Sequence, residues 1–213
     1  AKESTFGNLR YFKRLPEGTE RGVATSKVIN LSDVFGDSDQ TNKFVTRYLQ
    51  ATHCDLFFAD AAILVEGAAE SMLLPHFIRS KYPELYQRYI TILGVNGRHV
   101  HRLSPLLEKL CLPTLVITDL DPAEREGHHK SAVPKRGEGQ ISGNYAITKW
   151  LLKEKDIDKL LDCPEAKKEI HFATPYQFSI RIAYQTPVTV DFEGEEKEAI
   201  AGTFEDCLIY TNY

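Results

Sequence analysis

The chain has 213 residues, of which 42% are hydrophobic and 26% charged, a composition typical of a folded globular protein. Its formal net charge of -4 excludes nucleic-acid binding through an overall positive charge. Any binding to nucleic acid would need local basic patches, or metal ions that offset the acidic residues. The chain has no apolar run of membrane-spanning length, and its four cysteines lack C-x-x-C spacing, so we expect a cytoplasmic protein with reduced thiols and no membrane partner.

The first 38 residues contain short strand-like segments and turn sequences. "RYFKRL" and "SKVINL" are separated by "PEGTERG", whose proline and glycines are typical of a turn. These residues include too few apolar side chains for a hydrophobic core of their own. We therefore interpret residues 1–38 as an N-terminal extension and residues 39–213 as the main domain. Apolar side chains at helical spacing predict that this domain begins with a helix over residues 39–57.

Beyond this helix, apolar segments of strand length alternate with segments of helical periodicity. Strands are expected within residues 61–67, 89–97, 113–121 and 168–174, and helices within residues 69–82, 99–110 and 141–155. Apolar strands that alternate with helices are typical of a mostly parallel sheet covered by helices on both faces. The sequence therefore predicts an α/β fold. Ser142 and Asn144 suit the N-cap of the last of these helices.

The C-terminal segment has a different pattern. Residues 178–202 alternate between apolar and polar side chains around Pro187 and the Glu193–Gly194 pair, which predicts a β-hairpin. Residues 203–213 predict a short closing helix. The expected architecture is therefore a mostly parallel sheet with helices on both faces, followed by a C-terminal β-hairpin and a short helix.

Acidic residues stand where two of the predicted strands end. Glu66 ends the first strand, and Asp119 and Asp121 end the third. Glu70 lies in the first turn of the helix after Glu66, where the helix dipole accommodates a negative charge. Ligands of open parallel sheets bind at the carboxyl ends of the strands, so these four carboxylates converge if the two strands are neighbours.

Such a cluster is costly through like-charge repulsion unless cations offset it. Mg²⁺ binds carboxylate oxygens, and two such ions about 4 Å apart can clamp the oxygens of an in-line phosphoryl transfer. Each acidic pair alone has an ordinary interpretation, because aspartates also cap helices and begin turns. The two pairs together, each after its own apolar strand, favour a functional metal site.

The same residues resemble the Toprim domain of topoisomerases, primases and some nucleases. The family pattern is a glutamate after the first strand, a glycine turn after the second and D-x-D after the third, which here are Glu66, Gly97, Asp119 and Asp121. The segments "DLFFADAAILVEGAAE", "SGNYAITKWL" and "TFEDCLIYTN" resemble the C-terminal nuclease region of OLD (overcoming lysogenization defect) proteins. The resemblance covers residues 39–213.

This resemblance implies a metal-dependent DNA endonuclease that uses two divalent ions, Mg²⁺ or Mn²⁺, with Ca²⁺ also expected to bind. In OLD proteins an N-terminal ABC-type ATPase domain precedes the Toprim nuclease, so residues 1–38 would be the tail of that domain. The resemblance also implies a homodimer. The family uses a lysine beyond the closing helix, a position that lies past Tyr213.

Carried over by position, Glu66, Asp119 and Asp121 would be the catalytic residues, and Glu66 is also a candidate general base. The metal ligands would be Glu66, Glu70, Asp119, Asp121 and Glu205. From the residues alone, Glu205 is equally well a first-turn acid that follows Thr203 on the closing helix.

Two locally basic segments flank the predicted metal site, one after the second strand and one after D-x-D. The candidate DNA contacts in them are Arg98, His99, His101, Arg102, Lys130, Lys135 and Arg136. As groups beside a metal site, they suit contacts to the phosphates of a DNA backbone. For any single residue, a solvated loop is the ordinary interpretation.

Two other functions compete with a nuclease. The first is a Toprim module that binds DNA or partners in recombination without cleaving, although the four acids argue against it. The second is a phosphatase in which the first aspartate of D-x-D is the nucleophile. In that interpretation Glu66 and Glu70 would have no role, and Pro122 stands where such phosphatases have small residues. Metal binding and the choice between phosphodiester and phosphomonoester substrates separate these functions.

Overall fold

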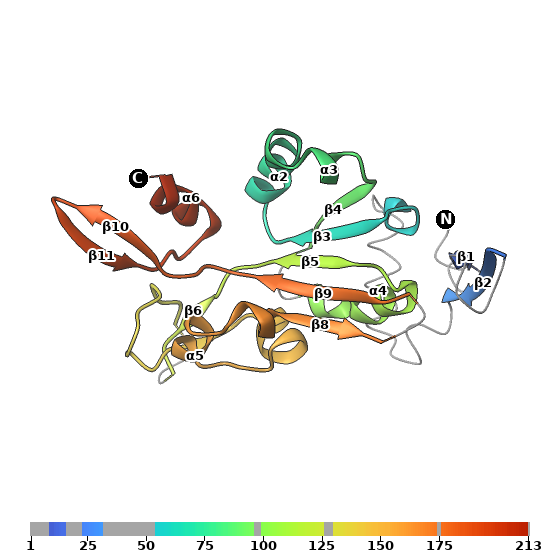
Figure 1. The fold of residues 1–213 in the computed structure, drawn as a ribbon. Helices are drawn as coiled ribbons and strands as arrows, with labels where there is room; N and C mark the ends of the chain where they lie inside the picture. The colour runs from blue at the N-terminus through green and yellow to red at the C-terminus, as the bar shows by residue number, and fades with distance from the viewer. Residues whose placement is uncertain are drawn as a thin grey trace.

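The computed structural model describes residues 9–15, 23–31, 54–95, 99–125, 130–173 and 176–212, and the account that follows concerns these residues. Its centre is a five-stranded sheet in the order β4-β3-β5-β9-β8 (Figure 1). These strands are β3 (Ala61–Val65), β4 (Ile90–Gly94), β5 (Thr114–Ile117), β8 (Glu169–Phe172) and β9 (Phe178–Ala183). The pairs of β3 with β4, β3 with β5 and β5 with β9 are parallel, and only the edge strand β8 is antiparallel to its neighbour. The predicted mostly parallel sheet is confirmed.

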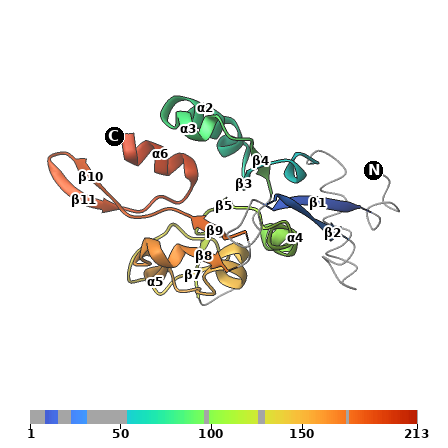
Figure 2. The ribbon, with the colours of Figure 1, turned by 45° about the vertical axis from the view of Figure 1, so that its right-hand side comes forward.

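Helices cover both faces of this sheet. Successive side chains of β3 point to opposite faces and so enter two different hydrophobic cores. Ala62 and Leu64 belong to the larger hydrophobic core, and Ile63 and Val65 belong to a smaller one that includes Ile78. The larger core is covered by η4 (Val100–Leu103), α4 (Ser104–Leu110) and the π-helix η5 (Ala146–Leu151). The smaller core lies under α2 (Ala68–Lys81), which α3 (Pro83–Tyr86) follows (Figure 2).

The helix predicted over residues 141–155 is broken into several elements. Its start is β7 (Ile141–Ser142), which pairs with β6 (Pro122–Ala123), and only Ala146–Leu151 are helical. The helix predicted here therefore begins later, where the Asn144 side chain accepts a hydrogen bond from the backbone nitrogen of Ala146 at 2.9 Å. The short helices α5 (Ile157–Leu161) and η6 (Glu165–Lys168) then lead to β8.

The C-terminal prediction was right about the turn and wrong about one strand. The hairpin consists of β10 (Val188–Phe192) and β11 (Glu195–Ala199), and Glu193 and Gly194 form its turn with φ of 56° and 81°. The first part of the predicted hairpin is instead β9 of the central sheet, parallel to β5. A half-buried hairpin arm and a sheet strand show the same alternation, so the pattern did not distinguish them.

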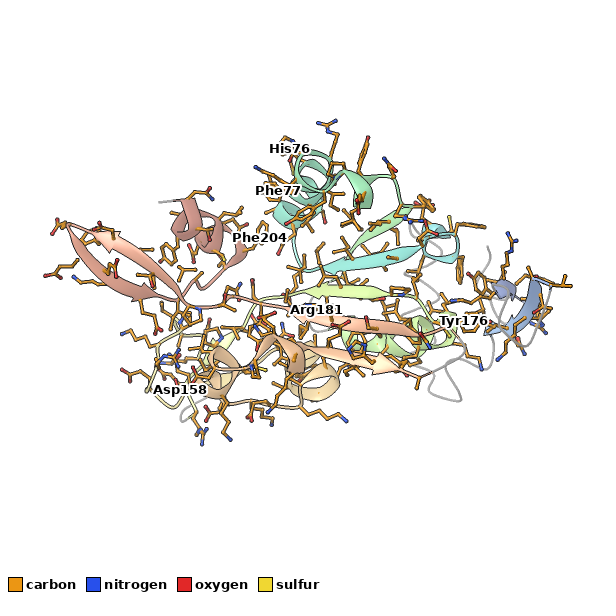
Figure 3. All side chains as sticks on the ribbon, in the orientation of Figure 1. His76, Phe77, Asp158, Tyr176, Arg181 and Phe204 are labelled. Carbon is orange, nitrogen blue, oxygen red and sulfur yellow. The ribbon has the colours of Figure 1, made fainter. Side chains whose placement is uncertain are left out.

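The chain ends with α6 (Phe204–Asn212), as predicted. The β10–β11 hairpin extends away from the sheet, and α6 returns to pack against α2 (Figure 1). Phe204, the first residue of α6, lies on the side that faces α2, which carries Phe77 (Figure 3). The hairpin and α6 both lie on the side of the molecule where β3, β5 and β9 end.

The N-terminal segment forms a hairpin of β1 (Arg10–Leu15) and β2 (Thr25–Asn30). Ile29 and Leu31 are buried in the larger core, so this extension is stabilised by the main sheet. The helix predicted over residues 39–57 lies outside the described residues except for Cys54–Phe57, which form the 3-10 helix η3. Within the described part of the chain, no helix is long and apolar enough to span a membrane.

Candidate active site

The predicted acids meet at one edge of the sheet because their strands are direct neighbours. Leu64 of β3 is paired in register with Val116 of β5, and both strands run in the same direction. Glu66 follows β3 directly, and Asp119 and Asp121 follow β5. The condition on which the sequence prediction depended, that the two strands are adjacent, is therefore met.

Glu66 is held by two uncharged hydrogen-bond donors. Its Oε1 accepts hydrogen bonds from the Asn144 side-chain amide, at 2.8 Å, and from the Thr118 hydroxyl. The pKa of Glu66 is raised to about 7, mainly by burial and also by the charges of Asp121 and Asp119, against the lowering effect of the Asn144 hydrogen bond. The carboxyl group therefore changes protonation state near neutral pH.

Asp119 is held in a similar way by another buried amide. The Gln185 side chain, which is 5% exposed, donates from Nε2 to Asp119 and accepts at Oε1 from the Leu120 backbone nitrogen at 2.9 Å. Burial raises the pKa of Asp119 to about 6, and the charges of Asp121, Glu70 and Glu205 also raise it. All five predicted acidic ligands are thus close enough for charges to interact across this edge.

Glu70 is buried at the start of α2, with 5% of its surface exposed. The preceding Gly67 is the N-cap of this helix, and a Cβ at Gly67 would lie 2.7 Å from Oε2 of Glu70. Glycine at this position therefore leaves room for the Glu70 carboxylate to lie over the end of β3. Sequence analysis identified Glu70 but gave no reason for the glycine.

Asp121 lies in a strained turn beside the same amide. Its φ of 46° is in the left-handed region, which residues other than glycine adopt infrequently. The Gly143 backbone nitrogen donates to the Asp121 carbonyl oxygen at 2.9 Å, and Asn144 Nδ2 lies 3.3 Å from Asp121 Oδ2. The segment that begins with β7 therefore fixes the position of the second aspartate of D-x-D.

Asn144 connects these groups, whereas the sequence predicted it first as a helix cap and only secondarily as a residue near phosphate. The cap is present, but the side chain is 2% exposed and its amide contacts Glu66, Thr118 and Asp121. Gln185 was not identified at all. These amides come from segments 78 and 66 residues away from the carboxylates that they contact, and no local pattern indicates such contacts.

Glu205 is at the start of α6, where its two predicted roles can be compared. The helix is capped by other residues, since the Thr203 hydroxyl accepts from the Asp206 backbone nitrogen at 3.1 Å and Asp206 Oδ2 accepts from the Thr203 nitrogen at 3.2 Å. Glu205 takes no part in this reciprocal cap. Its side chain is exposed, and its charge acts on Asp119.

The carboxylates do not already surround a metal position. Within the described ranges, no three acidic, histidine or cysteine side chains are arranged to hold an ion. Glu66 and Asp119 instead accept hydrogen bonds from uncharged donors. The candidate ligands are carboxylate oxygens, which suit Mg²⁺ and Mn²⁺. The raised pKa values of Glu66 and Asp119 reflect burial and mutual repulsion of negative charges, and a bound cation would offset this cost.

The two basic segments differ in how their charges are used. Arg136 forms ion pairs with Asp162 at 2.8 Å and Glu198 at 3.1 Å, so it links the hairpin to the end of α5. Lys130 and Lys135 are exposed in the same loop. In the other segment, His99, His101 and Arg102 lie at η4, and Arg98 lies outside the described residues.

Comparison with known proteins gives two matches. Residues 57–121 match the family described as "Overcoming lysogenization defect protein-like, TOPRIM domain". The chain is also 30% identical over 219 residues to the endonuclease GajA of Bacillus cereus (strain HuB5-5), an alignment that covers 99% of this chain and 28% of that protein. The family match contains Glu66, Glu70, Asp119 and Asp121, whereas Asn144 and the residues after it lie outside it.

Proposed function

We propose that this chain is the nuclease region of a larger protein that cleaves phosphodiester bonds in DNA with the help of divalent metal ions. The proposal starts from the OLD-like TOPRIM domain that the chain contains. The observation that carries this proposal is that Glu66, Asp119 and Asp121, which follow two adjacent parallel strands, meet Glu70 of α2 at one edge of the sheet. Similarity to an endonuclease over nearly the whole chain supports it.

The ligands of two Mg²⁺ or Mn²⁺ ions would be Glu66, Glu70, Asp119, Asp121 and Glu205. Bound ions would offset the charge of the phosphate and stabilise the attacking and leaving oxygens. Because Glu66 and Asp119 now accept hydrogen bonds from neutral donors, loading requires their carboxylates to reorient or share these donors. Carboxylate groups can accept several contacts at once, so the donors and the ions are compatible.

Glu66 would act as the general base that removes a proton from the attacking water. The pKa of Glu66 is about 7 without metal, and bound cations would lower it, so the carboxyl group would be ionised and able to accept this proton. Asn144 and Thr118 would orient this carboxyl group through Oε1. These two residues are positioning residues, because in the proposal they act through Glu66 and do not touch the phosphate.

The full-length protein would contain more than this chain, which spans about a quarter of the length of the endonuclease that it matches. We propose that an N-terminal ATPase domain precedes the TOPRIM domain, that residues 1–38 belong to its end, and that residues 39–213 are the nuclease domain. We also propose that the protein is a homodimer and that a lysine after Tyr213 stabilises charge during cleavage. These features follow from the family resemblance.

A non-catalytic TOPRIM module that binds DNA is the second candidate. The observation that favours it is that the described side chains are not already arranged as a three-ligand metal group. In such a protein, the buried amides around Glu66 and Asp119 would serve to keep acidic groups stable without an ion. The two functions differ in metal binding and in DNA cleavage.

The test is to incubate the purified chain with supercoiled plasmid in Mg²⁺, Mn²⁺, Ca²⁺ or EDTA. Glu66→Ala is the test variant, and Glu84→Ala, which removes an exposed acid of α3, is the matched control. We expect nicked or linear DNA with Mg²⁺ or Mn²⁺, from the wild type and the control but not from Glu66→Ala. A parallel assay with p-nitrophenyl phosphate tests the phosphatase.

Metal binding, measured by calorimetry, decides between the remaining outcomes. Binding without cleavage would favour the non-catalytic module, or a chain that needs the additional lysine. Hydrolysis of the monoester alone would favour the phosphatase. The absence of any metal binding would overturn the proposed metal site.

A further inference from the structure

A basic and aromatic cluster lies beside the acidic edge and is formed by two segments that are far apart in the sequence. The Tyr145 ring, just before η5, has the Lys149 ammonium group 4.0 Å from its centroid. The His101 ring, from η4, meets the same tyrosine edge to face, with the centroids 5.6 Å apart. Tyr145 and Lys149 were not among the DNA contacts predicted from the sequence.

The backbone places this cluster next to the acids. Asn144 and Tyr145 are consecutive, and the buried Asn144 side chain reaches Glu66 and Asp121 while Tyr145 is 39% exposed and contacts His101. On the other side, Val95, which follows β4, lies beside the end of β3, because its backbone nitrogen donates to the Val65 carbonyl oxygen at 2.7 Å. The cluster therefore borders the same carboxyl edge as Glu66.

The positive charge of this cluster is not used within the described structure. Lys149 is exposed, and among the described residues no carboxylate lies within ion-pair distance of it. Burial lowers the pKa of His101, and the nearby charges of Arg102 and Lys149 also lower it, so the imidazole is neutral at pH 7 and Lys149 supplies the charge of the cluster. In the described part of the chain, His101 Nδ1 is buried without a hydrogen-bond partner.

Lys149 forms no ion pair within the described part of the chain, and a bound anion would offset its charge. Arg136, by contrast, has two acidic partners. The cation–π contact holds the Lys149 ammonium group over the Tyr145 ring. The side chain is therefore already restricted, and it loses less conformational entropy when it binds an anion. The cluster therefore has the chemistry of an anion-binding site that is partly preorganised.

We infer that Lys149, held by Tyr145 and adjacent to His101, binds a backbone phosphate of the DNA strand next to the phosphate that lies at the acidic edge. The inference rests on the proposed function, because it names a second contact of the same substrate. Lys149 supplies the charge, and Tyr145 positions it. The acids alone would repel DNA, so a cationic group beside them helps to hold the strand across the site.

The experiment measures DNA binding without cleavage, by fluorescence anisotropy of a labelled duplex in EDTA and in Ca²⁺ at several salt concentrations. The variants are Lys149→Gln, Lys149→Arg and the control Lys109→Gln, which removes an exposed lysine near the end of α4, where the chain turns toward the start of β5. Loss of one phosphate contact makes the slope of log K against log salt less steep by about 0.9. If the affinity at 1 M salt is unchanged, binding at 0.1 M salt becomes roughly eightfold weaker. We expect this change for Lys149→Gln, and wild-type behaviour for the control and largely for Lys149→Arg.

A second pair of variants tests the aromatic support. Tyr145→Phe keeps the ring and should retain most of the affinity, whereas Tyr145→Leu should weaken binding about two- to fivefold because the cation–π contact is lost. Thermal melts confirm that each variant is folded. If Lys149→Gln binds DNA with the affinity and salt slope of the wild type, the inference is wrong. Plasmid nicking is scored separately, so a chain that binds DNA through Lys149 but does not cleave contradicts the nuclease and leaves this inference standing.

Discussion

The acids at the carboxyl edge are held in two different ways. Glu66 and Asp119 follow strands of the central sheet, and each accepts a hydrogen bond from a buried amide, Asn144 or Gln185. Glu205 is exposed on α6, which is joined to the sheet through the β10–β11 hairpin. The sheet therefore supplies an inner set of carboxylates held by buried amides, and the C-terminal segment adds an outer carboxylate that depends on how α6 packs against α2.

This difference predicts the largest effect at Glu66. Glu66→Gln keeps an oxygen that can accept hydrogen bonds from Asn144 and Thr118 but removes the charge and the basic group. We expect the nicking rate to fall about 100-fold or more, because a general base typically contributes that much. The rate is measured on supercoiled plasmid in saturating Mn²⁺. Activity within a few-fold of the wild type would mean that the inner carboxylates are not catalytic.

The next effect is expected at the buried amide. Asn144→Ala removes the donor to Glu66 and Asp121, and loss of a residue that orients metal ligands typically costs about 10- to 100-fold in metal affinity or activity. Titration of nicking against Mn²⁺ concentration measures the change.

The matched control for Asn144→Ala is Thr148→Val. The Thr148 hydroxyl donates to the Asn144 carbonyl oxygen at 2.7 Å, so this change affects the same residue without touching its amide. We expect its Mn²⁺ titration to resemble that of the wild type. Equal losses in both variants would show that the effect of Asn144→Ala comes from disturbing η5 and not from the carboxylates.

The outer acid should matter less. Glu205→Gln removes an exposed charge, and exposed charge interactions are worth about 0.2–1 kcal/mol, so we expect metal affinity to fall roughly two- to fivefold. Asp206→Ala is the control, because it removes the side-chain half of the reciprocal helix cap while keeping Glu205. Calorimetry with Mn²⁺ measures both. A loss at Glu205 as large as that at Glu66 would remove the distinction between the inner and outer acids.

The smallest effect concerns pH and stability without metal. The pKa of Glu66 is raised from 4.5 to about 7 by folding, so the folded protein binds more protons than the unfolded chain between these values. This group therefore favours the folded state most at low pH, and its contribution is lost as pH rises toward 7. In EDTA, the melting temperature of Glu66→Gln should decline less than that of the wild type between pH 5 and pH 7.5. Parallel curves would show that Glu66 titrates normally.

Much of the inner set was predictable because its signals are local. The apolar run of β3 followed by Glu66, and that of β5 followed by Asp119 and Asp121, indicate strands that end in acids. The rule that ligands bind at the carboxyl ends of parallel strands then brings the acids together. The strand assignment failed at Phe178–Ala183, because alternation at period two is the same in a hairpin arm and in a sheet strand.

The sequence by itself determined the mostly parallel α/β fold and the acids at its strand ends, because strand length, helical periodicity and the position of an acid after a strand are properties of neighbouring residues. Only the tertiary structure decided which groups surround those acids. Asn144 and Gln185 reach their positions through the segment before η5 and the segment after β9, and the carboxylates of Glu66 and Asp119 that they contact are 78 and 66 residues away. Such contacts depend on how the whole chain packs, because a side-chain amide has no local pattern that reveals its partner.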